Sequence, residues 1–312
     1  PQLKSDLIAL FAEALFPFDN YISAPDMGST EYDIQHIYEF NSKMLGTDNH
    51  ARGGVGRESS HGGIPIDDWE LTAHGLFTAI KTLEDLGYGI KLKGARVVIQ
   101  GYGNVGAPIA SKLYSEGAVI VGASDINTGL WNPAGLDTEQ LNRVRNTPGG
   151  LHNYHSKTDR RFNSNQVDWL LEAPCDILVP AARPDAITAR NADRIQCKVI
   201  LQGANSPVNK MTDYYLSNRR NIISLSDFIV NSGGIIGCAV ELTMKTDIDY
   251  KKKVEMKGTR LYTENLIKET ISKNIKQVFS EATAIDGTDI FFREKAISLA
   301  KNRLQTPEDN WL

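Results

Sequence analysis

Residues 96–106 read RVVIQGYGNVG, and this stretch decides the fold of the chain. Its first five residues form the apolar run of a buried strand, and a glycine-rich turn follows without a break. Gly101, Gly103 and Gly106 then give the pattern G-x-G-x-x-G directly before a predicted helix over residues 108–114. In this context Gly101 permits a tight turn, Gly103 lets the backbone approach a pyrophosphate, and Gly106 lets the helix pack closely on the strand.

A second strand is predicted over Val119–Ala123, and Asp125 follows it, nineteen residues after Gly106. An acidic side chain there accepts hydrogen bonds from the adenosine ribose and repels a 2′-phosphate, which favours NAD over NADP. The N-terminus of the intervening helix offers N–H groups to the phosphates. The residues predicted to bind NAD are Gly101, Gly103, Asn104, Val105, Gly106, Asp125 and Ile126. The alternative is a plain cluster of turn glycines followed by a surface aspartate.

Short apolar strands alternate with helices beyond this point. Strands are predicted over 177–179, 199–201 and 222–224, and a helix over 138–145. Alternation at this spacing is typical of a parallel sheet with right-handed crossovers. The predicted fold class is therefore α/β, with a Rossmann-type doubly wound parallel sheet.

The two ends of the chain have helical periodicity instead. Helices are predicted over 3–16, 30–44, 71–86 and, in the C-terminal part, 241–284, with a short strand running into a loop over 21–29 and a loop over 46–63. Thr30 is the expected N-cap of the second helix, because Asp33 stands three residues later.

Composition excludes several classes of protein. The formal net charge of −4 provides no basic surface for a phosphate backbone, so no nucleic-acid partner is expected. The three cysteines form no C-x-x-C pair, which fits a reducing cytoplasm. No apolar run approaches the ~20 residues that span a bilayer, so no membrane association is expected. His152 and His155 lie in a predicted loop without a third ligand nearby, and no metal site is predicted.

Seven motifs in order show that the chain resembles the glutamate/leucine/phenylalanine/valine dehydrogenase family. The motifs are YISAPDMGST (21–30), GGIPIDDWELTAHG (62–75), LKGARVVIQGYGNVG (92–106), SDINTGLWNPAGLD (124–137), DILVPAA (176–182), LQGANSPV (201–208) and SDFIVNSGGII (226–236). The resemblance implies oxidation of an L-amino acid to a 2-oxo acid and ammonia, with hydride passing from Cα to the nicotinamide.

The resemblance also implies roles for individual residues. Asp26 matches the aspartate that shuttles protons in catalysis. Thr72 and Asn231 match the side chains that bond the nicotinamide carboxamide, and Asn205 matches the contact to the nicotinamide ribose. Ala181 and Ala182 match the backbone segment that passes over the cofactor, while Gly233 and Gly234 would let the chain approach the ring. The alternative for each is a helix cap, a turn residue or a packing residue.

The domain organisation also follows from the resemblance. Residues 1–70 correspond to the C-terminal part of a substrate domain, residues 71–240 to the NAD-binding domain, and residues 241–312 to helices that pack back on the substrate domain. The sheet is thus expected to be flanked by helical remnants of the substrate domain. In the family, a preceding segment carries the lysine that activates water. No G-G-x-K-G-G-like stretch occurs here, so we expect the chain to be a fragment, and a homo-oligomer if that segment is present.

The substrate side chain is left open between leucine, valine or phenylalanine and glutamate. Glutamate-specific members have a serine seven residues after the asparagine matched by Asn231, where this chain has Cys238. Ile235, Ile236 and Cys238 favour an apolar side chain, because a buried carboxylate needs partners.

Two other functions compete with the dehydrogenase. One is an NAD-binding regulatory or pseudoenzyme subunit without catalysis. The other is a Rossmann dehydrogenase of different chemistry, such as a hydroxy-acid enzyme, which would need a catalytic histidine late in the chain. No histidine follows His155.

Overall fold

The computed structural model describes residues 2–26, 28–48, 52–283 and 291–305. The chain forms two compact units. The first unit comprises Pro1–Thr72 and Gly233–Ile267, and the second unit comprises Ala73–Ser232 and Lys268–Leu312.

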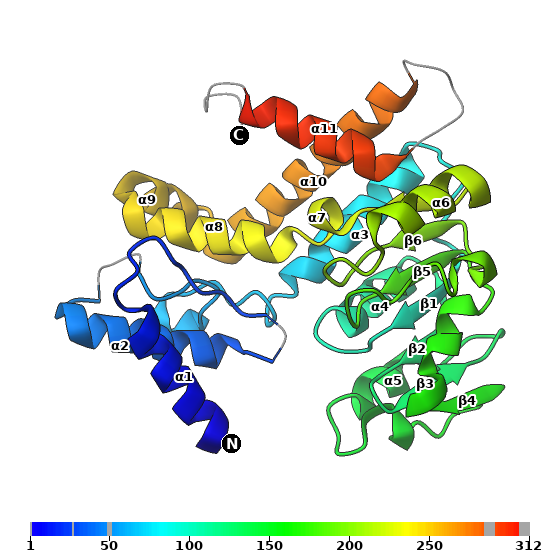
Figure 1. Ribbon diagram of the computed structural model, residues 1–312, viewed down its shortest axis with the longest axis horizontal. Coiled ribbons are helices and arrows are strands. Elements are labelled where there is room, and N and C mark those ends of the chain that lie inside the picture. The colour runs from blue at the N-terminus through cyan, green and yellow to red at the C-terminus, as the bar shows by residue number, and fades with distance from the viewer. Residues whose placement is uncertain (1, 27, 49–51, 284–290, 306–312) are drawn as a thin grey trace. The chain divides into compact units, whose positions relative to one another are not determined.

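The second unit is built on one seven-stranded sheet, drawn as arrows in Figure 1. Its strand order is β4-β3-β2-β1-β5-β6-β7. The strands are β1 (Arg96–Gln100), β2 (Val119–Ser124), β3 (Thr128–Trp131), β4 (Arg160–Asn163), β5 (Ile177–Pro180), β6 (Val199–Leu201) and β7 (Ile223–Leu225). Strands β2, β1, β5, β6 and β7 run parallel, with Val97 opposite Ile120 on one side and Ile177 on the other. The predicted α/β Rossmann-type fold is confirmed.

The sheet is mixed, however, and not wholly parallel as predicted. β3 pairs antiparallel with β2, and β4 pairs antiparallel with β3, so together they extend the sheet at one edge. Neither strand is predicted from the sequence, because each has only four residues and β4 (RRFN) lacks an apolar run. The exposed edge strand β4 needs no continuous apolar sequence, whereas β1 is buried on both faces.

Helices connect and cover the strands of the second unit. They are α4 (Gly106–Ser115), α5 (Thr138–Val144), α6 (Lys210–Arg220), α7 (Asp227–Val230) and α11 (Phe292–Leu304), with 3-10 turns at Gly150–Asn153, Ser164–Glu172 and Ala192–Arg194. Two helices cross between the units, α3 (Leu71–Asp85) and α10 (Thr259–Thr283).

The first unit is helical, with α1 (Gln2–Leu15), α2 (Glu31–Leu45), α8 (Gly233–Thr246) and α9 (Ile248–Met256), and a 3-10 turn at Ser59–His61. α2 begins as predicted, because the Thr30 side chain accepts from the Asp33 N–H while the Asp33 carboxylate accepts from the Thr30 N–H. α1 packs on α2 through Ala12 and Ile8, which contact Ile34 and Ile37.

The strand predicted within residues 21–29 is wrong. The described residues of that stretch have irregular backbone, and Met27 lies outside them. Pro25 has no N–H to give to a ladder, and the hydrogen bond from the Val55 N–H to the Ser23 carbonyl is not continued into a strand pair.

The two units also differ from the predicted division at 70 and 240. Residues 241–267 belong to the first unit, but residues 268–312 belong to the second. The reason is the packing of α11. Phe292, Ala296 and Leu299 are buried, and the Phe292 ring lies 5.8 Å from that of Phe279 in α10.

Candidate functional site

The glycine-rich loop has the geometry that its three glycines require. Gly101 has φ of 90°, and a Cβ there would lie 2.8 Å from the backbone of Ala182. A Cβ on Gly106 would lie 1.8 Å from the Gly101 carbonyl oxygen, because α4 begins directly against the end of β1. Any side chain at either position would therefore displace backbone.

Gly103 is different, because a Cβ there would meet nothing within 4 Å. The protein itself therefore leaves the space beside Gly103 open. Arg145 donates from Nη1 to the Gly103 carbonyl at 3.1 Å, and the Tyr102 hydroxyl donates to Asn142 at 3.0 Å. Asn142 in α5 and Arg145 at the C-terminal end of that helix thus hold the glycine-rich loop in place. The space beside Gly103, next to the N-terminus of α4, stays open. That combination suits an anion such as a pyrophosphate.

No local sequence pattern points to Arg145 as part of this loop. It lies at the C-cap of α5, 42 residues from its partner Gly103, so only the fold brings the two together.

Asp125 lies where predicted, just after β2, but its carboxylate already has three partners. Oδ1 accepts from the N–H groups of Asn127 (2.8 Å) and Thr128 (2.7 Å), and Oδ2 accepts from the N–H of Leu151 (2.7 Å). Two carboxylate oxygens offer about four lone-pair positions, so one is left for a ribose hydroxyl. Ile126 beside it is 84% exposed and offers an apolar surface at the same turn.

Three loops meet at the carboxyl edge of the parallel strands. Ala181 and Ala182 follow β5, and the Ala181 N–H donates to the Gln100 carbonyl at 2.8 Å. A Cβ on Gly203, after β6, would lie 3.0 Å from the Cβ of Ala181. The loops after β1, β5 and β6 are therefore in van der Waals contact at the edge where open α/β sheets bind their ligands.

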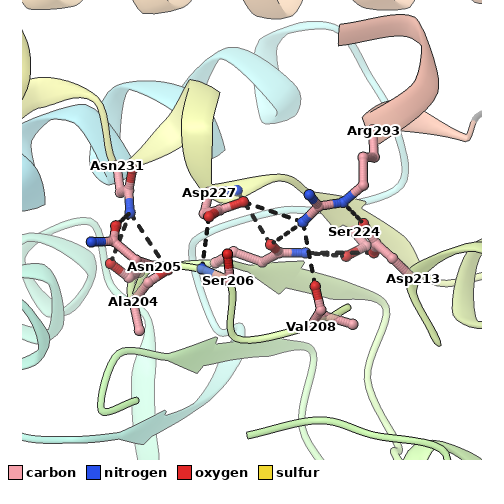
Figure 2. Close-up of polar contacts among 11 residues, drawn as sticks. Ala204, Asn205, Ser206, Val208, Asp213, Ser224, Asp227, Asn231 and Arg293 are labelled. Atoms are coloured by element: carbon pink, nitrogen blue, oxygen red, sulfur yellow. Dashed lines mark hydrogen bonds and ion pairs between the residues drawn. The ribbon is translucent and has the colours of Figure 1, made fainter. Parts of the chain in front are cut away.

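Asn205 and Asn231 are bonded to each other in the second unit (Figure 2). The Asn231 Nδ2 donates to the Asn205 Oδ1 at 2.9 Å and to the carbonyls of Gly203 and Ala204 at 3.4 and 3.5 Å. Both side chains thus belong to one polar cluster, as expected if they act on one ligand.

Asp26 and Thr72 lie in the first unit. Asp26 forms a turn with Ser29, whose hydroxyl accepts from the Asp26 N–H at 2.8 Å just before α2 begins. Thr72 is in the first turn of α3, and a Cβ on Gly234 would lie 3.0 Å from its Oγ1. Gly233 and Gly234 therefore let α8 begin in contact with α3.

A buried ionic network packs against the segment that contains Asp26. Glu241 is 1% exposed, and its Oε2 accepts from the N–H groups of Gly56 (2.9 Å) and Ile64 (2.8 Å). Its Oε1 pairs with Arg57 at 2.8 Å and Lys245 at 3.2 Å. A Cβ on Gly56 would lie 2.6 Å from Pro25 and 3.4 Å from the Cys238 sulfur, so the Ala24–Asp26 segment packs on this network.

Burial changes the proton affinity of two groups in the network. It lowers the pKa of Lys245 to about 8, against the attraction of Glu241. It raises the pKa of the Cys238 thiol to about 12, with Glu241 adding to the effect. Cys238 is therefore a neutral thiol at physiological pH.

In the second unit, the structure places Gly101–Gly106, Asp125, Ala181, Ala182 and Asn205 after the ends of strands, and Asn231 after α7. It places Asp26 and Thr72 in the first unit. Among the described residues, no group of three His, Cys, Asp or Glu side chains could hold a metal ion. None of the described helices has the length and apolarity to cross a bilayer.

This fold and loop define a Rossmann-type dinucleotide-binding domain. The Glutamate/Leucine/Phenylalanine/Valine dehydrogenase family matches residues 62–307, and the chain belongs to that family. Membership argues against the alternative of an unrelated Rossmann dehydrogenase.

Glutamate dehydrogenases are among its relatives. One from Aeropyrum pernix is 37% identical over 53% of this chain, the catabolic NAD-specific enzyme RocG of Bacillus subtilis is 41% identical over 47%, and an NADP-specific enzyme of Saccharolobus shibatae is 33% identical over 70%. The matches cover 40%, 33% and 50% of these relatives. The chain thus spans about half their length or less.

Solved structures share the fold. A hetero-hexameric glutamate dehydrogenase from Thermus thermophilus matches with a TM-score of 0.81 at 22% identity, covering 97% of this chain and 68% of that one. A Plasmodium falciparum glutamate dehydrogenase matches with a TM-score of 0.76 at 19% identity, covering 96% and 64%.

Proposed function

We propose that this chain provides the NAD-binding part of an enzyme that oxidatively deaminates an L-amino acid to its 2-oxo acid and ammonia. The observation that carries the proposal is the carboxyl edge of the sheet, where the open space at Gly103, the acceptor Asp125 and the Asn205–Asn231 pair follow β1, β2, β6 and α7. In this assignment Gly101–Gly106 bind the pyrophosphate, Asp125 and Ile126 the adenosine, and Ala181, Ala182, Asn205, Asn231 and Thr72 the nicotinamide half. Asp26 shuttles the proton.

NAD is the proposed cofactor because of Asp125. The relatives include both NAD-specific and NADP-specific enzymes, so the family alone does not choose between them. A 2′-phosphate would meet a carboxylate that has one acceptor position left and no donor. We expect NAD to bind at least about tenfold more tightly than NADP, or about 1.4 kcal/mol, and Asp125→Ser to narrow the gap. Calorimetric titration of both cofactors measures it, and equal affinities would contradict the assignment.

The loop assignment has its own test in a pair of glycine variants. Gly103→Val places a branched side chain where the pyrophosphate would lie, but the protein has room for it. NAD binding should be lost while the melting temperature stays near that of the wild type. Gly106→Ala is the matched control, because its Cβ collides with the Gly101 carbonyl and should destabilise the fold itself. A Gly103→Val protein that still binds NAD normally would refute the loop assignment.

Two observations bear on the substrate side chain and point in opposite directions. The named relatives are glutamate dehydrogenases. Yet the two cations of the network beside Cys238 are both bonded to Glu241, and the thiol is neutral. An apolar side chain fits that environment better than a carboxylate. Parallel assays of NADH formation with leucine, valine, phenylalanine and glutamate decide between them.

Catalysis itself is tested at Asp26. In the native polypeptide Asp26→Asn should reduce amino-acid oxidation by about 100- to 10,000-fold, the usual contribution of a general acid or base. NAD affinity should be unchanged. A native polypeptide that binds NAD but gives no NADH with any amino acid would instead favour the regulatory or pseudoenzyme subunit.

Self-association belongs to the same proposal. The Thermus thermophilus neighbour is described as hetero-hexameric. We propose that the native protein assembles from several copies, which light scattering on the purified protein would measure. A monomeric mass would rule this out.

A further inference from the structure

Arg293, in the first turn of α11, ties together several elements of the second unit (Figure 2). Its side chain is only 13% exposed. Nε donates to the Asp213 Oδ2 at 2.7 Å, and Nη2 reaches the Asp227 Oδ1 at 3.2 Å and the Gln202 Oε1 at 3.1 Å. One guanidinium fork thus bonds α6, the start of α7 and the residue after β6, which a lysine could not do.

Asp227 connects Arg293 to the loop after β6. While its Oδ1 pairs with Arg293, its Oδ2 accepts from the Ser206 N–H at 2.7 Å. Ser206 has φ of 47°, a left-handed conformation that residues other than glycine rarely adopt, because Cβ then crowds the following carbonyl oxygen. The bond to Asp227 holds Ser206 in that conformation, and Ser206 directly follows Asn205.

Asp227 also determines where the other asparagine lies. It is the first residue of α7, and Asn231 is the residue after that helix, with its N–H donating to the Asp227 carbonyl at 2.8 Å. Asn205 is therefore set through Ser206, and Asn231 through α7. Both ends of the 2.9 Å bond between the asparagines therefore depend on Asp227, which is one of the residues that Arg293 holds.

We infer that Arg293 is a positioning residue for the nicotinamide half of the cofactor, acting through Asp227 on Asn205 and Asn231; this inference rests on the proposed function. Arg293 touches neither asparagine, so its effect must be indirect. Without the guanidinium, Asp227 loses the partner that orients its carboxylate toward Ser206. The left-handed turn then relaxes and the asparagine pair loses its fixed geometry. The glycine-rich loop after β1 is not part of this chain of contacts.

The separation between the two halves of the cofactor gives a direct test. ADP occupies only the adenosine and pyrophosphate positions, whereas NADH also needs Asn205 and Asn231. In the 312-residue protein, Arg293→Met should weaken NADH binding at least tenfold and leave the ADP affinity within twofold of wild type. Arg293→Lys keeps the charge but not the fork, and should lie near the Met variant. NADH fluorescence and calorimetry with ADP provide the two dissociation constants.

Arg303→Met is the matched control on the same helix. Arg303 donates to Asn274 at 2.7 Å and to Gln277 at 3.3 Å, so it fastens α11 to α10 and not to the loop after β6. This variant should leave the ratio of NADH to ADP affinity unchanged even if it lowers the melting temperature. Equal losses of NADH and ADP affinity in Arg293→Met, or no loss of either, would overturn the inference.

A double-variant cycle locates the path. If Arg293 acts through Asp227, Arg293→Met should add little to the loss of NADH affinity caused by Asp227→Asn. Fully additive losses would overturn the path through Asp227. A wild-type protein that binds neither NADH nor ADP would refute the proposed function, which is a different result from selective binding that Arg293→Met leaves intact.

Discussion

Each of the two units buries an arginine in an ionic network, but the charge in excess is positive in the first unit and negative in the second. In the first unit, the single carboxylate of Glu241 faces Arg57 and Lys245. In the second, the single guanidinium of Arg293 faces Asp213 and Asp227. Burial accordingly lowers the pKa of Lys245 to about 8 and raises the pKa of Asp213, so each shift falls on the sign in excess. In both networks a buried ion pair holds a loop in place. The group whose charge is in excess determines how the stability depends on pH.

The largest expected effect is the loss of the Glu241 carboxylate, which among the described residues is the one carboxylate paired with Arg57 and Lys245. Glu241→Gln leaves Arg57 and Lys245 buried without a counter-charge, and breaking such a buried pair commonly costs about 3–5 kcal/mol. Urea denaturation of the first unit measures it. Lys245→Met is the control, because Glu241 keeps Arg57 and its backbone donors, and we expect a change within about 1 kcal/mol. Equal losses in the two variants would break the comparison.

The next largest expected effect is the pH dependence of stability that arises from Lys245 in the first unit. Lys245 has a pKa of about 8 in the folded protein against 10.5 when unfolded. Between these values the unfolded chain binds more protons, so the free energy of unfolding rises with pH, by up to about 3 kcal/mol. Below pH 8 both states are protonated and the contribution is constant. Comparing wild type with Lys245→Met from pH 7.5 to 10.5 isolates it, and parallel curves would refute it.

The carboxylate of Glu31 is also buried, but no cationic partner faces it among the residues that the structure describes. It accepts from the Asp67 N–H at 2.9 Å, and burial, with the neighbouring Asp67 and Asp68, raises its pKa to about 7. The folded state then binds more protons between pH 4.5 and 7, so stability falls as pH rises through that window. Solvent screening reduces the full effect, and we expect about 1–2 kcal/mol. Glu31→Gln keeps the acceptor oxygen and should flatten the curve, as denaturation at pH 5 and 8 would show. An unchanged pH dependence would contradict it.

The sequence predicted what local pattern controls. The glycine-rich loop, its strand and the cap at Thr30 need only adjacent residues, and each lies where expected. The buried networks had no such signal, because Arg57 and Glu241 are 184 residues apart and Arg293 and Asp213 are 80 apart. Among the three donors to Asp125, the Leu151 N–H had no signal for the same reason, since Leu151 lies 26 residues away. Asn127 and Thr128 donate from the local turn, two and three residues after Asp125.

The wrong strand at 21–29 and the missed β3 and β4 share a cause. Strand formation depends on an available partner edge, which a short window of sequence does not contain. Residues 128–131 form a strand because the turn at Asp125 returns the chain along β2. The roles of Asp26, Thr72, Asn205 and Asn231 came from the family resemblance, and those roles stay predictions.

The smallest effect is expected in the second network, at Asp213. Burial raises the pKa of Asp213, so its ionisation opposes folding and stability falls as pH rises from 3.8 toward the folded pKa. Asp213→Asn removes that charge, keeps an oxygen for the Arg293 Nε, and leaves Asp227 as the counter-charge. The free energy of unfolding at pH 7 should therefore change by less than about 1 kcal/mol, within the range of one hydrogen bond, and its difference between pH 4 and pH 7 should shrink. Urea titrations at both pH values measure this.

A loss as large as that of Glu241→Gln would show that both carboxylates are required and that the second network has no surplus charge. A small change would show that one carboxylate is enough to balance Arg293. The charge in excess, negative in this network and positive in the first unit, would then determine which group of each network can be replaced.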